Sequence, residues 1–333
     1  MIESTVPEEF NGLAGTQATH EHTLLDKPNV VGVALGNKYT NGVDTGEKGI
    51  SVLVESKVRE HLLGADELIP RTVDGVALDV QEVGILQAGN EPPADGPGDR
   101  EPAGSQALTS RARPAFGGLS IGHFRITAGT LGTCCYDAEG FPGKPTRYYL
   151  LSNNHVLANS NNAAIGDPIL QPGPVDGGTS PTDVIARLSR FVPIKFTHPG
   201  QPAPLNLVDA AIAEGEFADL ERRIYWIGYL SGVEPTPRPD ELVRKCGRTS
   251  NFSTGRIRNI NATVNVNYGE GKVARFARQI LTTDMSEGGD SGSVVAGRDG
   301  RAVGLLFAGS PQVTIASPMS LVQDKLGIRV SED

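Results

Sequence analysis

Residues 285–295 read Met-Ser-Glu-Gly-Gly-Asp-Ser-Gly-Ser-Val-Val, with Ser291 between Asp290 and Gly292 and an apolar run from Val294. Glycine permits backbone conformations that a side chain would block. A tight glycine-rich turn can therefore expose a serine hydroxyl and aim neighbouring backbone N–H groups at one point, as an acyl-transfer nucleophile requires. Ordinary hairpin turns use the same residue types. The functional interpretation therefore depends on whether the chain also supplies a base and an acid.

His155 is the strongest candidate for the base. It follows an apolar stretch, 148–151, that predicts a strand, and it precedes a second apolar pair, so it is expected at a firmly held strand end. Imidazole is largely neutral near pH 7 and can accept a proton from a serine hydroxyl. His198 lies in a proline-rich loop and His123 in a glycine-flanked segment, and both are weaker candidates. A purely structural role is the alternative for each histidine.

Asp209 is the strongest candidate for the acid, because it interrupts the apolar stretch 205–213. A buried carboxylate is costly unless it is paired, and such a cost often marks a functional site. The alternative is a strand-end aspartate that accepts hydrogen bonds from backbone amides. Asp167, Asp176 and Asp183 lie in predicted loops and are not set among apolar residues in this way.

Composition excludes several classes of protein. The 333 residues carry a net charge of −9, which makes nucleic acid an unexpected partner. The sequence has no apolar run long enough to span a membrane and no apolar signal core at its acidic N-terminus. Three cysteines, two of them adjacent at Cys134 and Cys135, make a poor disulfide framework and favour a reducing, cytoplasmic compartment. His20 and His22 lack the company of further ligands, and we expect no metal and no other cofactor.

The first third of the chain divides into three predicted segments. Residues 1–27 are polar and are expected to be flexible. Residues 28–87 predict a small α+β module, with strands at 30–35, 49–54 and 78–83 and a short helix at 57–63. Residues 88–113 are rich in proline and glycine, with Leu108 as the single large apolar residue, and predict a flexible linker. In a peptidase such a linker would also be a plausible site of self-cleavage.

Residues 114–333 predict a second, mainly β region. Its short strands and dense turns indicate a sandwich or a pair of barrels. The predicted strands are 126–136, 148–151, 205–213, 224–230, 255–268, 279–283, 293–296, 302–308 and 313–316. A helix is expected near the C-terminus, with Ser317 as its N-cap, Pro318 at its first position and Gly327 at its end.

His155, Asp209 and Ser291 stand in the chain order used by the trypsin/chymotrypsin-like serine peptidase superfamily, which residues 114–330 resemble. The resemblance implies a chymotrypsin-like double β-barrel with a C-terminal helix, preceded by the small α+β module. The segment Lys-Cys-Gly-Arg-Thr-Ser at 245–250 is similar to the start of the second barrel in cytoplasmic-type members. The N-terminal module is similar to the leader domain of those proteins, which include the plant Narrow-leaf proteins.

The resemblance also implies roles for individual residues. Ser291 would attack the scissile carbonyl, His155 would transfer the proton and Asp209 would orient the imidazole. The backbone N–H groups of Gly289 and Ser291 would form the oxyanion hole. Asp290 is expected to be structural. The implied activity is that of a serine endopeptidase acting on protein or peptide substrates.

Substrate preference does not follow from the family. The residue six positions before the nucleophile is Met285, where family members that cleave after Lys or Arg carry aspartate. We therefore expect an apolar specificity pocket lined by Met285 and Gly309. Ser293 replaces the glycine that usually ends the serine motif.

Two other functions are compatible with the sequence. One alternative is a catalytically silent scaffold that binds or assembles other proteins. The other is a peptidase that stays latent until a regulatory partner or self-association moves the N-terminal module. Cys246 is a thiol in a predicted strand, where a buried and inert role is expected rather than a nucleophilic one.

Overall fold

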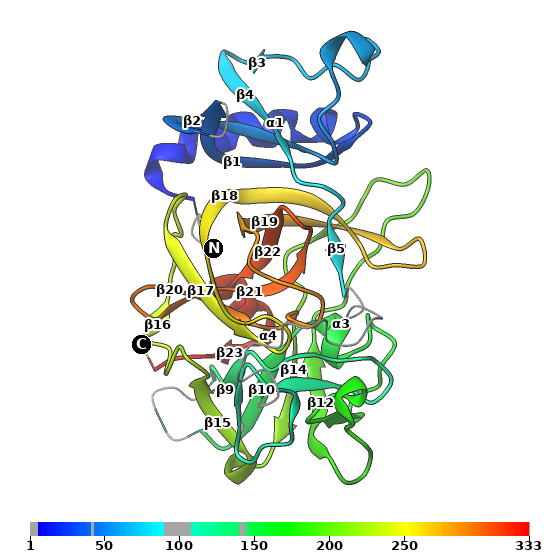
Figure 1. The fold of residues 1–333 in the computed structure, drawn as a ribbon, viewed down its shortest axis with the longest axis vertical. Coiled ribbons are helices and arrows are strands. Elements are labelled where there is room, and N and C mark those ends of the chain that lie inside the picture. The colour runs from blue at the N-terminus through cyan, green and yellow to red at the C-terminus, as the bar shows by residue number, and fades with distance from the viewer. Residues whose placement is uncertain (1–5, 41–42, 90–107, 140–142, 144, 333) are drawn as a thin grey trace, which may run out of the picture.

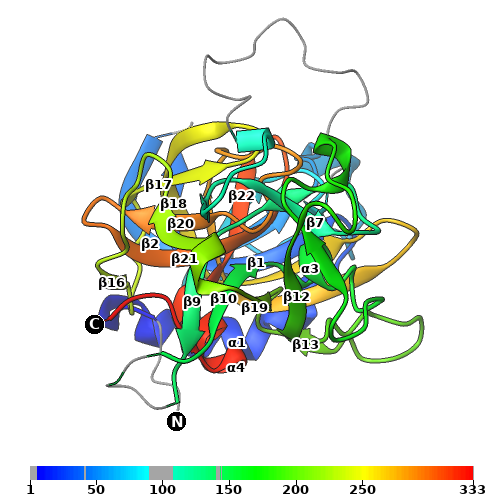
Figure 2. The same ribbon diagram turned by 90° about the horizontal axis from the view of Figure 1, so that it is seen from below.

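The structure is a computed structural model that describes residues 6–40, 43–89, 108–139, 143 and 145–332. The chain is mainly β and is built around two large sheets, which correspond to the two expected barrels (Figure 1). Figure 2 looks from the side of the first sheet, whose green strands lie in front of the blue N-terminal strands. None of the helices in the described ranges has the length and apolar character that a bilayer crossing needs.

The first barrel is an eight-stranded sheet in the order β23-β9-β10-β14-β12-β11-β7-β8. Its strands are β7 (Ser120–His123), β8 (Gly129–Thr130), β9 (Thr133–Asp137), β10 (Tyr148–Ser152), β11 (Pro168–Leu170), β12 (Val184–Phe191), β14 (Ala211–Gly215) and β23 (Ile328–Arg329). A separate two-stranded sheet joins β6 (Ala115–Gly117) to β15 (Leu220–Ile224). Short 3-10 helices η3 (Pro174–Asp176) and η4 (Phe217–Asp219) lie in the connections.

The second barrel belongs to a thirteen-stranded sheet. Its C-terminal strands are β13 (Leu205–Asn206), β16 (Gly232–Val233), β17 (Leu242–Gly247), β18 (Asn251–Asn267), β19 (Val273–Thr283), β20 (Val294–Gly297), β21 (Arg301–Gly309) and β22 (Val313–Pro318). Its N-terminal strands are β1 (Val30–Thr40), β2 (Val43–Val54), β3 (Thr72–Val73), β4 (Val76–Glu82) and β5 (Gln87–Ala88).

The N-terminal strands are continuous with the second barrel. Strand β1 pairs antiparallel with β18, for example at Val33 opposite Thr263, and the sheet continues through β2 and β4 to β3. One buried hydrophobic cluster contains residues of β1 and β2 together with Val243 and Ile257 of the barrel. The N-terminal part of the chain and the second barrel therefore share a sheet and a core.

The prediction that residues 1–27 are flexible is wrong for most of that segment. A 3-10 helix, η1 (Glu8–Phe10), leads into α1 (Asn11–Leu25), which packs on β1. Gln17 is buried, and its side-chain amide donates to the carbonyl oxygens of Val33 (3.2 Å) and Asn261 (2.9 Å). Polar contacts hold the helix together with the buried Leu24 and Leu25. The sequence of the helix therefore lacks the continuous apolar stripe by which a surface helix is recognised.

Other predicted elements differ in their bounds. The expected strand at 205–213 is interrupted between β13 and β14, and the expected strand at 126–136 is divided between β8 and β9. The strand predicted at 224–230 is wrong, because β15 ends at Ile224 and the chain turns through Trp226, whose φ is +61°. The helix predicted at 57–63 is reduced to a 3-10 turn, η2 (Glu60–Leu62).

The expected C-terminal helix is confirmed as α4 (Met319–Leu326), with Gly327 at its end in the left-handed conformation (φ +65°). The N-cap, however, is Pro318. The hydroxyl of Ser317 donates to Oε1 of Gln279 at 2.9 Å instead of capping the helix.

The predicted linker at 88–113 is only partly within the described residues, since 90–107 lie outside them. At its start Ala88 belongs to β5, and toward its end Leu108 is fully buried in the core of the first barrel. The backbone N–H of Ala112 donates to Oε1 of Gln171 at 3.0 Å. Both described ends are therefore packed against the folded protein rather than flexible.

The loop that carries Ser291 is held by a buried ion pair. The carboxylate of Asp290 accepts hydrogen bonds from Nζ of Lys245 (2.6 Å), the hydroxyl of Ser250 (2.6 Å) and the backbone N–H groups of Thr249 (2.9 Å), Ser250 (3.1 Å) and Glu287 (3.0 Å). The side chains of Asp290 and Lys245 are both inaccessible to solvent. Burial alone would raise the pKa of Asp290, but Lys245 and the hydroxyl and amide donors outweigh it and hold the pKa below its ordinary value.

We expect Asp290→Asn to destabilise the fold. The change leaves Lys245 as a buried unpaired charge, a type of loss that costs about 3–5 kcal/mol. Urea denaturation at neutral pH measures the free energy of unfolding. Asp324→Asn is the control, because the carboxylate of Asp324 is half exposed and pairs only with the neighbouring Lys325 at 3.3 Å; it should change stability by less than about 0.5 kcal/mol.

The same pair of proteins gives a prediction for pH. Since the pKa of Asp290 is lowered in the folded state, its contribution is complete above the carboxyl pKa of the unfolded chain, about 4, and is lost as the pH falls further. The stability difference between the parent protein and Asp290→Asn should shrink between pH 7 and about pH 3. An equal difference at both pH values would contradict this role for the carboxylate.

Candidate active site

His155 lies one turn beyond the end of β10, in the short helix α3 (Asn154–Leu157). Before it, the hydroxyl of Ser152 donates to the carbonyl oxygen of Thr130 at 2.8 Å, and the side-chain amide of Asn153 donates to the carbonyl oxygen of Asp209 at 2.8 Å. These contacts fix the chain that enters the helix. The imidazole is therefore held at the boundary between the two barrels, as the sequence predicts for a strand-end histidine.

Asp209 lies in the interruption between β13 and β14 and is fully buried. Its Oδ2 is 2.6 Å from Nδ1 of His155 and accepts the hydroxyl of Tyr268 at 2.7 Å. Its Oδ1 accepts the backbone N–H of His155 at 3.3 Å. The carboxylate is thus paired on both oxygens, and the bond to Nδ1 holds the imidazole in the tautomer that leaves Nε2 free to accept a proton.

The nucleophile candidate, Ser291, lies in a loop whose backbone requires glycine at two positions. Gly289 and Gly292 have φ values of +97° and +98°, and a Cβ atom at Gly292 would approach Oγ of Ser152 to 2.0 Å. Thr130 of the first barrel clamps the loop, because its N–H donates to the carbonyl oxygen of Ser291 (2.8 Å) and its hydroxyl donates to that of Gly289 (2.9 Å). The loop is therefore fixed to both barrels.

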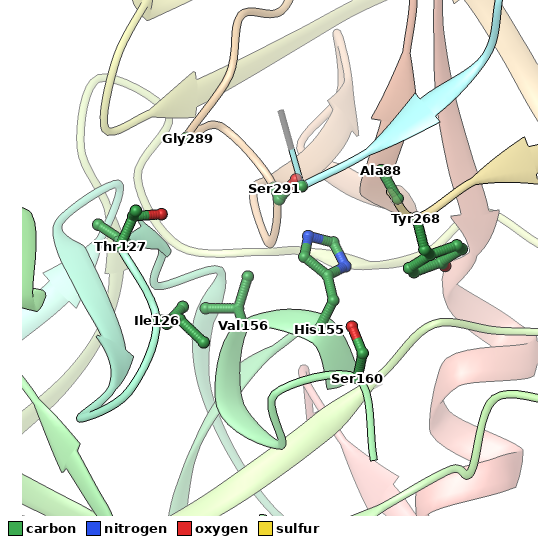
Figure 3. A pocket seen from close by; sticks show the side chains of 11 residues that line it. Ala88, Ile126, Thr127, His155, Val156, Ser160, Tyr268, Gly289 and Ser291 are labelled. Carbon is green, nitrogen blue, oxygen red and sulfur yellow. The ribbon is translucent and has the colours of Figure 1, made fainter. Parts of the chain in front are cut away.

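His155 and Ser291 line the same small cavity of about 130 Å³, and Figure 3 shows the serine facing the imidazole ring. The other lining residues are Ala88, Gly89, Ile126, Thr127, Ala128, Val156, Ser160, Tyr268 and Gly289. Among the described residues, Nε2 of His155 is buried and has no hydrogen-bond partner, so its bond to the serine hydroxyl is not formed in this conformation. Such bonds are often long in unliganded sites and tighten when substrate binds.

Tyr268 is a site residue whose role has no signal in the sequence. It ends the alternating pattern of β18, which predicts only a half-buried strand position. Its ring meets that of His155 edge to face, with 6.1 Å between centroids. Burial raises the pKa of Tyr268 well above its ordinary value, and the charge of Asp209 adds to the effect, so the phenol stays protonated and donates to that carboxylate.

The weaker histidine candidates lie elsewhere. His123 is buried, with Nε2 at 3.1 Å from the carboxylate of Asp167 and with Nδ1 accepting the N–H of Arg125 at 3.2 Å. His198 is exposed in a loop. Both have the structural or solvent-exposed settings that were the alternatives to a catalytic role.

The other aspartates are also committed to other partners. Asp176 forms a two-point ion pair with Arg248, with one of its oxygens 2.8 Å from Nε. Asp183 accepts the backbone N–H of Thr179 at 2.9 Å and pairs with Arg111 at 3.2 Å. Asp209 is therefore the aspartate that the fold brings to His155.

The backbone N–H groups of Gly289 and Ser291 have no acceptor within the described part of the chain. Both belong to the loop that the glycines shape. Cys246, in contrast, is buried in β17, and burial raises its pKa to about 12. The expectation that this thiol is buried is confirmed, and a thiol with so high a pKa is a poor nucleophile.

A larger cleft of about 700 Å³ opens on the other side of Ser291. The expectation that Met285 lines a specificity pocket is wrong, because this side chain is buried in the core and its sulfur lies against Gly255. Gly309 does line the cleft. The complete lining is Gln87, Gly89, Asp284, Ser286, Glu287, Gly288, Ser291, Leu306, Ala308, Gly309, Ser310 and Pro311, which is more polar than expected.

Comparisons with solved structures return bacterial proteases. Protease A from Thermobifida fusca is 17% identical, with a TM-score of 0.43, over 64% of this chain and 96% of that one. The Nocardiopsis protease is 19% identical, with a TM-score of 0.44, over 64% and 97%. The chymotrypsin of Cellulomonas bogoriensis is 18% identical, with a TM-score of 0.42, over 64% and 96%. No curated protein matches the sequence.

A family model gives the stronger result. The model described as "Trypsin-like peptidase domain" matches residues 132–305, which contain His155, Asp209 and Ser291. The match spans more than half of the 333 residues. The chain therefore belongs to the family of trypsin-like peptidases.

Proposed function

We propose that the protein is a serine endopeptidase that cleaves peptide bonds through Ser291, His155 and Asp209. The observation that carries the proposal is the fully buried carboxylate of Asp209, 2.6 Å from Nδ1 of His155, beside a cavity that the imidazole shares with Ser291. A buried carboxylate that orients an imidazole toward a serine is the arrangement that nucleophilic acyl transfer requires.

The proposed reaction has two stages. His155 accepts the proton of the Ser291 hydroxyl through Nε2 while Oγ attacks the scissile carbonyl carbon, and it then gives that proton to the leaving amine. The resulting acyl-enzyme is hydrolysed by a water molecule, which His155 deprotonates in turn. Asp209 stabilises the imidazolium in both stages, and the unpaired N–H groups of Gly289 and Ser291 are suited to hold the oxyanion.

Substitution of the three residues should remove activity without removing the fold. Ser291→Ala and His155→Ala are each expected to lower kcat by at least about 10⁴-fold, and Asp209→Asn by about 10⁴-fold. Turnover of a peptide substrate and labelling by a fluorophosphonate measure the effect. Ser160→Ala is the control, since this hydroxyl lines the same cavity but has no role in the proposal. Absence of labelling in the parent protein would favour the alternative of a catalytically silent scaffold.

Tyr268 is expected to act through Asp209. Tyr268→Phe removes one donor from a buried carboxylate, and hydrogen bonds to charged groups contribute about 1.5–3 kcal/mol, so kcat/KM should fall about 10-fold or more. Tyr229→Phe, at a phenol that is largely exposed, is the control. An unchanged kcat/KM would leave Tyr268 with a packing role alone.

We also propose that the larger cleft accepts a positively charged or hydrogen-bonding side chain of the substrate. Asp284 and Glu287 line this cleft and are exposed to solvent. Ser286 and Ser310 add hydroxyl groups to the lining. Burial raises the pKa of Asp284 above its ordinary value, although this carboxyl is ionised at neutral pH as long as that rise is modest.

The cleft predicts a measurable preference. Peptides with Lys before the scissile bond should be cleaved with a higher kcat/KM than matched peptides with Glu, because a cleft lined by carboxylates favours cations. Glu287→Gln should reduce this ratio about 5-fold or more, whereas Asp299→Asn, at an exposed turn away from the cleft, should leave it unchanged. A preference for Glu would contradict the proposal.

The proposals for cellular location and for partners rest on the cysteines and on the N-terminal module. All three cysteines are free and buried, which supports the expectation of a reducing, cytoplasmic compartment. We propose protein or peptide substrates, and we keep the likeness of the N-terminal module to the leader domain of Narrow-leaf-type proteins as a proposal. A regulatory partner or self-association would act through that module.

A further inference from the structure

The chain passes over its own candidate active site before it reaches the first barrel. Strand β5 (Gln87–Ala88) lies between two strands of the second barrel. It pairs antiparallel with β21, at Ala88 opposite Ala308 and Gln87 opposite Gly309, and parallel with β18, at Gln87 beside Asn267. Figure 1 shows β5 as the cyan arrow that runs from the N-terminal strands toward the first barrel.

Strand β5 is held by buried contacts. Leu86 and Ala88 are buried in one hydrophobic cluster with Phe307 of β21. The carbonyl oxygen of Leu86 accepts the N–H of Asn267 at 2.9 Å. The segment is therefore docked in a defined register and does not merely lie near the site.

The direction of β5 brings its C-terminal end to the reacting groups. Gly89 follows β5 directly, and a Cβ atom there would lie 3.4 Å from Cδ2 and 3.9 Å from Nε2 of His155. Gly89 lines both the small cavity and the larger cleft, and Ser291 is the other residue of the site that lines both. The segment thus runs as a strand through Gln87 and Ala88, and its next residue, Gly89, reaches the imidazole.

Peptides commonly bind by adding a strand to a sheet edge, with the main chain providing hydrogen bonds. Strand β21 continues from the residues that β5 covers to Leu306, whose backbone exchanges hydrogen bonds with Gly292 (2.8 Å) and Ser293 (2.9 Å). A peptide that added a strand to this edge would therefore present its next carbonyl group near Ser291. Gln87 and Ala88 already fill that edge. Gly89 has a φ of +65°, a conformation in which the chain leaves the extended direction and which other residues adopt only with strain.

We infer that Gln87–Gly89 is an internal occupant of the peptide-binding groove, so that an extended peptide substrate binds only when this segment leaves. The inference rests on the proposed function, because that function makes the groove a site for peptide substrates. Whether Gln87–Gly89 occupies the groove can be tested by peptide binding alone. A tethered segment acts at an effective concentration that reaches the millimolar range, so a free peptide of equal affinity competes poorly with it. Small reagents that need no strand pairing, such as a fluorophosphonate that phosphonylates serine and releases fluoride, should still reach Ser291.

Ala88→Pro is the variant that releases the segment. Proline removes a backbone N–H and is poorly tolerated in a strand with neighbours on both sides, as β5 has. The matched control is Thr72→Pro, which places proline in the other two-residue strand of the N-terminal part, β3, at the far end of the molecule (Figure 1). If Ala88→Pro does not fold, as judged by its thermal unfolding, Gly89→Val replaces it, because a β-branched residue is strained at this positive φ.

The first measurement is of binding and needs no catalysis. A fluorescent peptide with the sequence of residues 84–89, Gly-Ile-Leu-Gln-Ala-Gly, is titrated into proteins that carry Ser291→Ala, and its anisotropy is recorded. We expect Ala88→Pro to bind it at least tenfold more tightly than Thr72→Pro does. Equal binding to both variants, or binding to neither, would overturn the inference even if the peptidase activity is confirmed.

The second measurement uses the intact Ser291. Ala88→Pro should raise kcat/KM for a hexapeptide substrate at least tenfold over Thr72→Pro, and the free peptide 84–89 should inhibit only Ala88→Pro. The rate of fluorophosphonate labelling should differ less than threefold between the two. A parallel rise in labelling and in peptide hydrolysis would show a general activation of Ser291 and would contradict a blocked groove. If no variant is labelled or active while the peptide binds as expected, the proposed function fails and the inference on occupancy stands.

Discussion

The buried ion pair between Asp290 and Lys245 is the interaction on which the site depends. A carboxylate and an ammonium group without solvent are stable only if their remaining hydrogen-bonding capacity is satisfied. Here the carboxylate accepts five hydrogen bonds, three of them from the backbone N–H groups of Thr249, Ser250 and Glu287. These bonds fix the backbone just before Ser291. The same loop is clamped from the other barrel by Thr130, so Ser291 is positioned by the ion pair from one side and by hydrogen bonds from the other.

The candidate active site was largely predictable because it is encoded in short segments. The serine loop, the strand-end histidine and the aspartate set among apolar residues each carry a local signal, and the fold brings His155 and Asp209 into contact. Tyr268 and Gly89 carry no such signal. Their positions depend on the register of β18 and on the docking of β5, and register is fixed by pairing between distant segments rather than by local sequence.

The same distinction explains the fold. Most β-strands of the second barrel were expected from apolar runs and alternation, although bounds shifted where bulges interrupt the pairing. Helix α1 was missed because a buried glutamine and a few leucines hold it, and composition alone suggests a polar tail. The prediction that Met285 lines a specificity pocket was wrong for a related reason. A position counted from the nucleophile says which residue stands there, but not whether its side chain faces the cleft or the core.

The pairing of β1 with β18 has a consequence for synthesis on the ribosome. Val33 is opposite Thr263, so more than two hundred residues must be made before this partner exists. Until then β1 can form only its hairpin with β2, and its other edge offers unpaired backbone groups to any strand nearby. Late closure of so long a loop is slow and exposes apolar surface. A nascent chain of this protein is therefore expected to need protection by chaperones until β18 emerges.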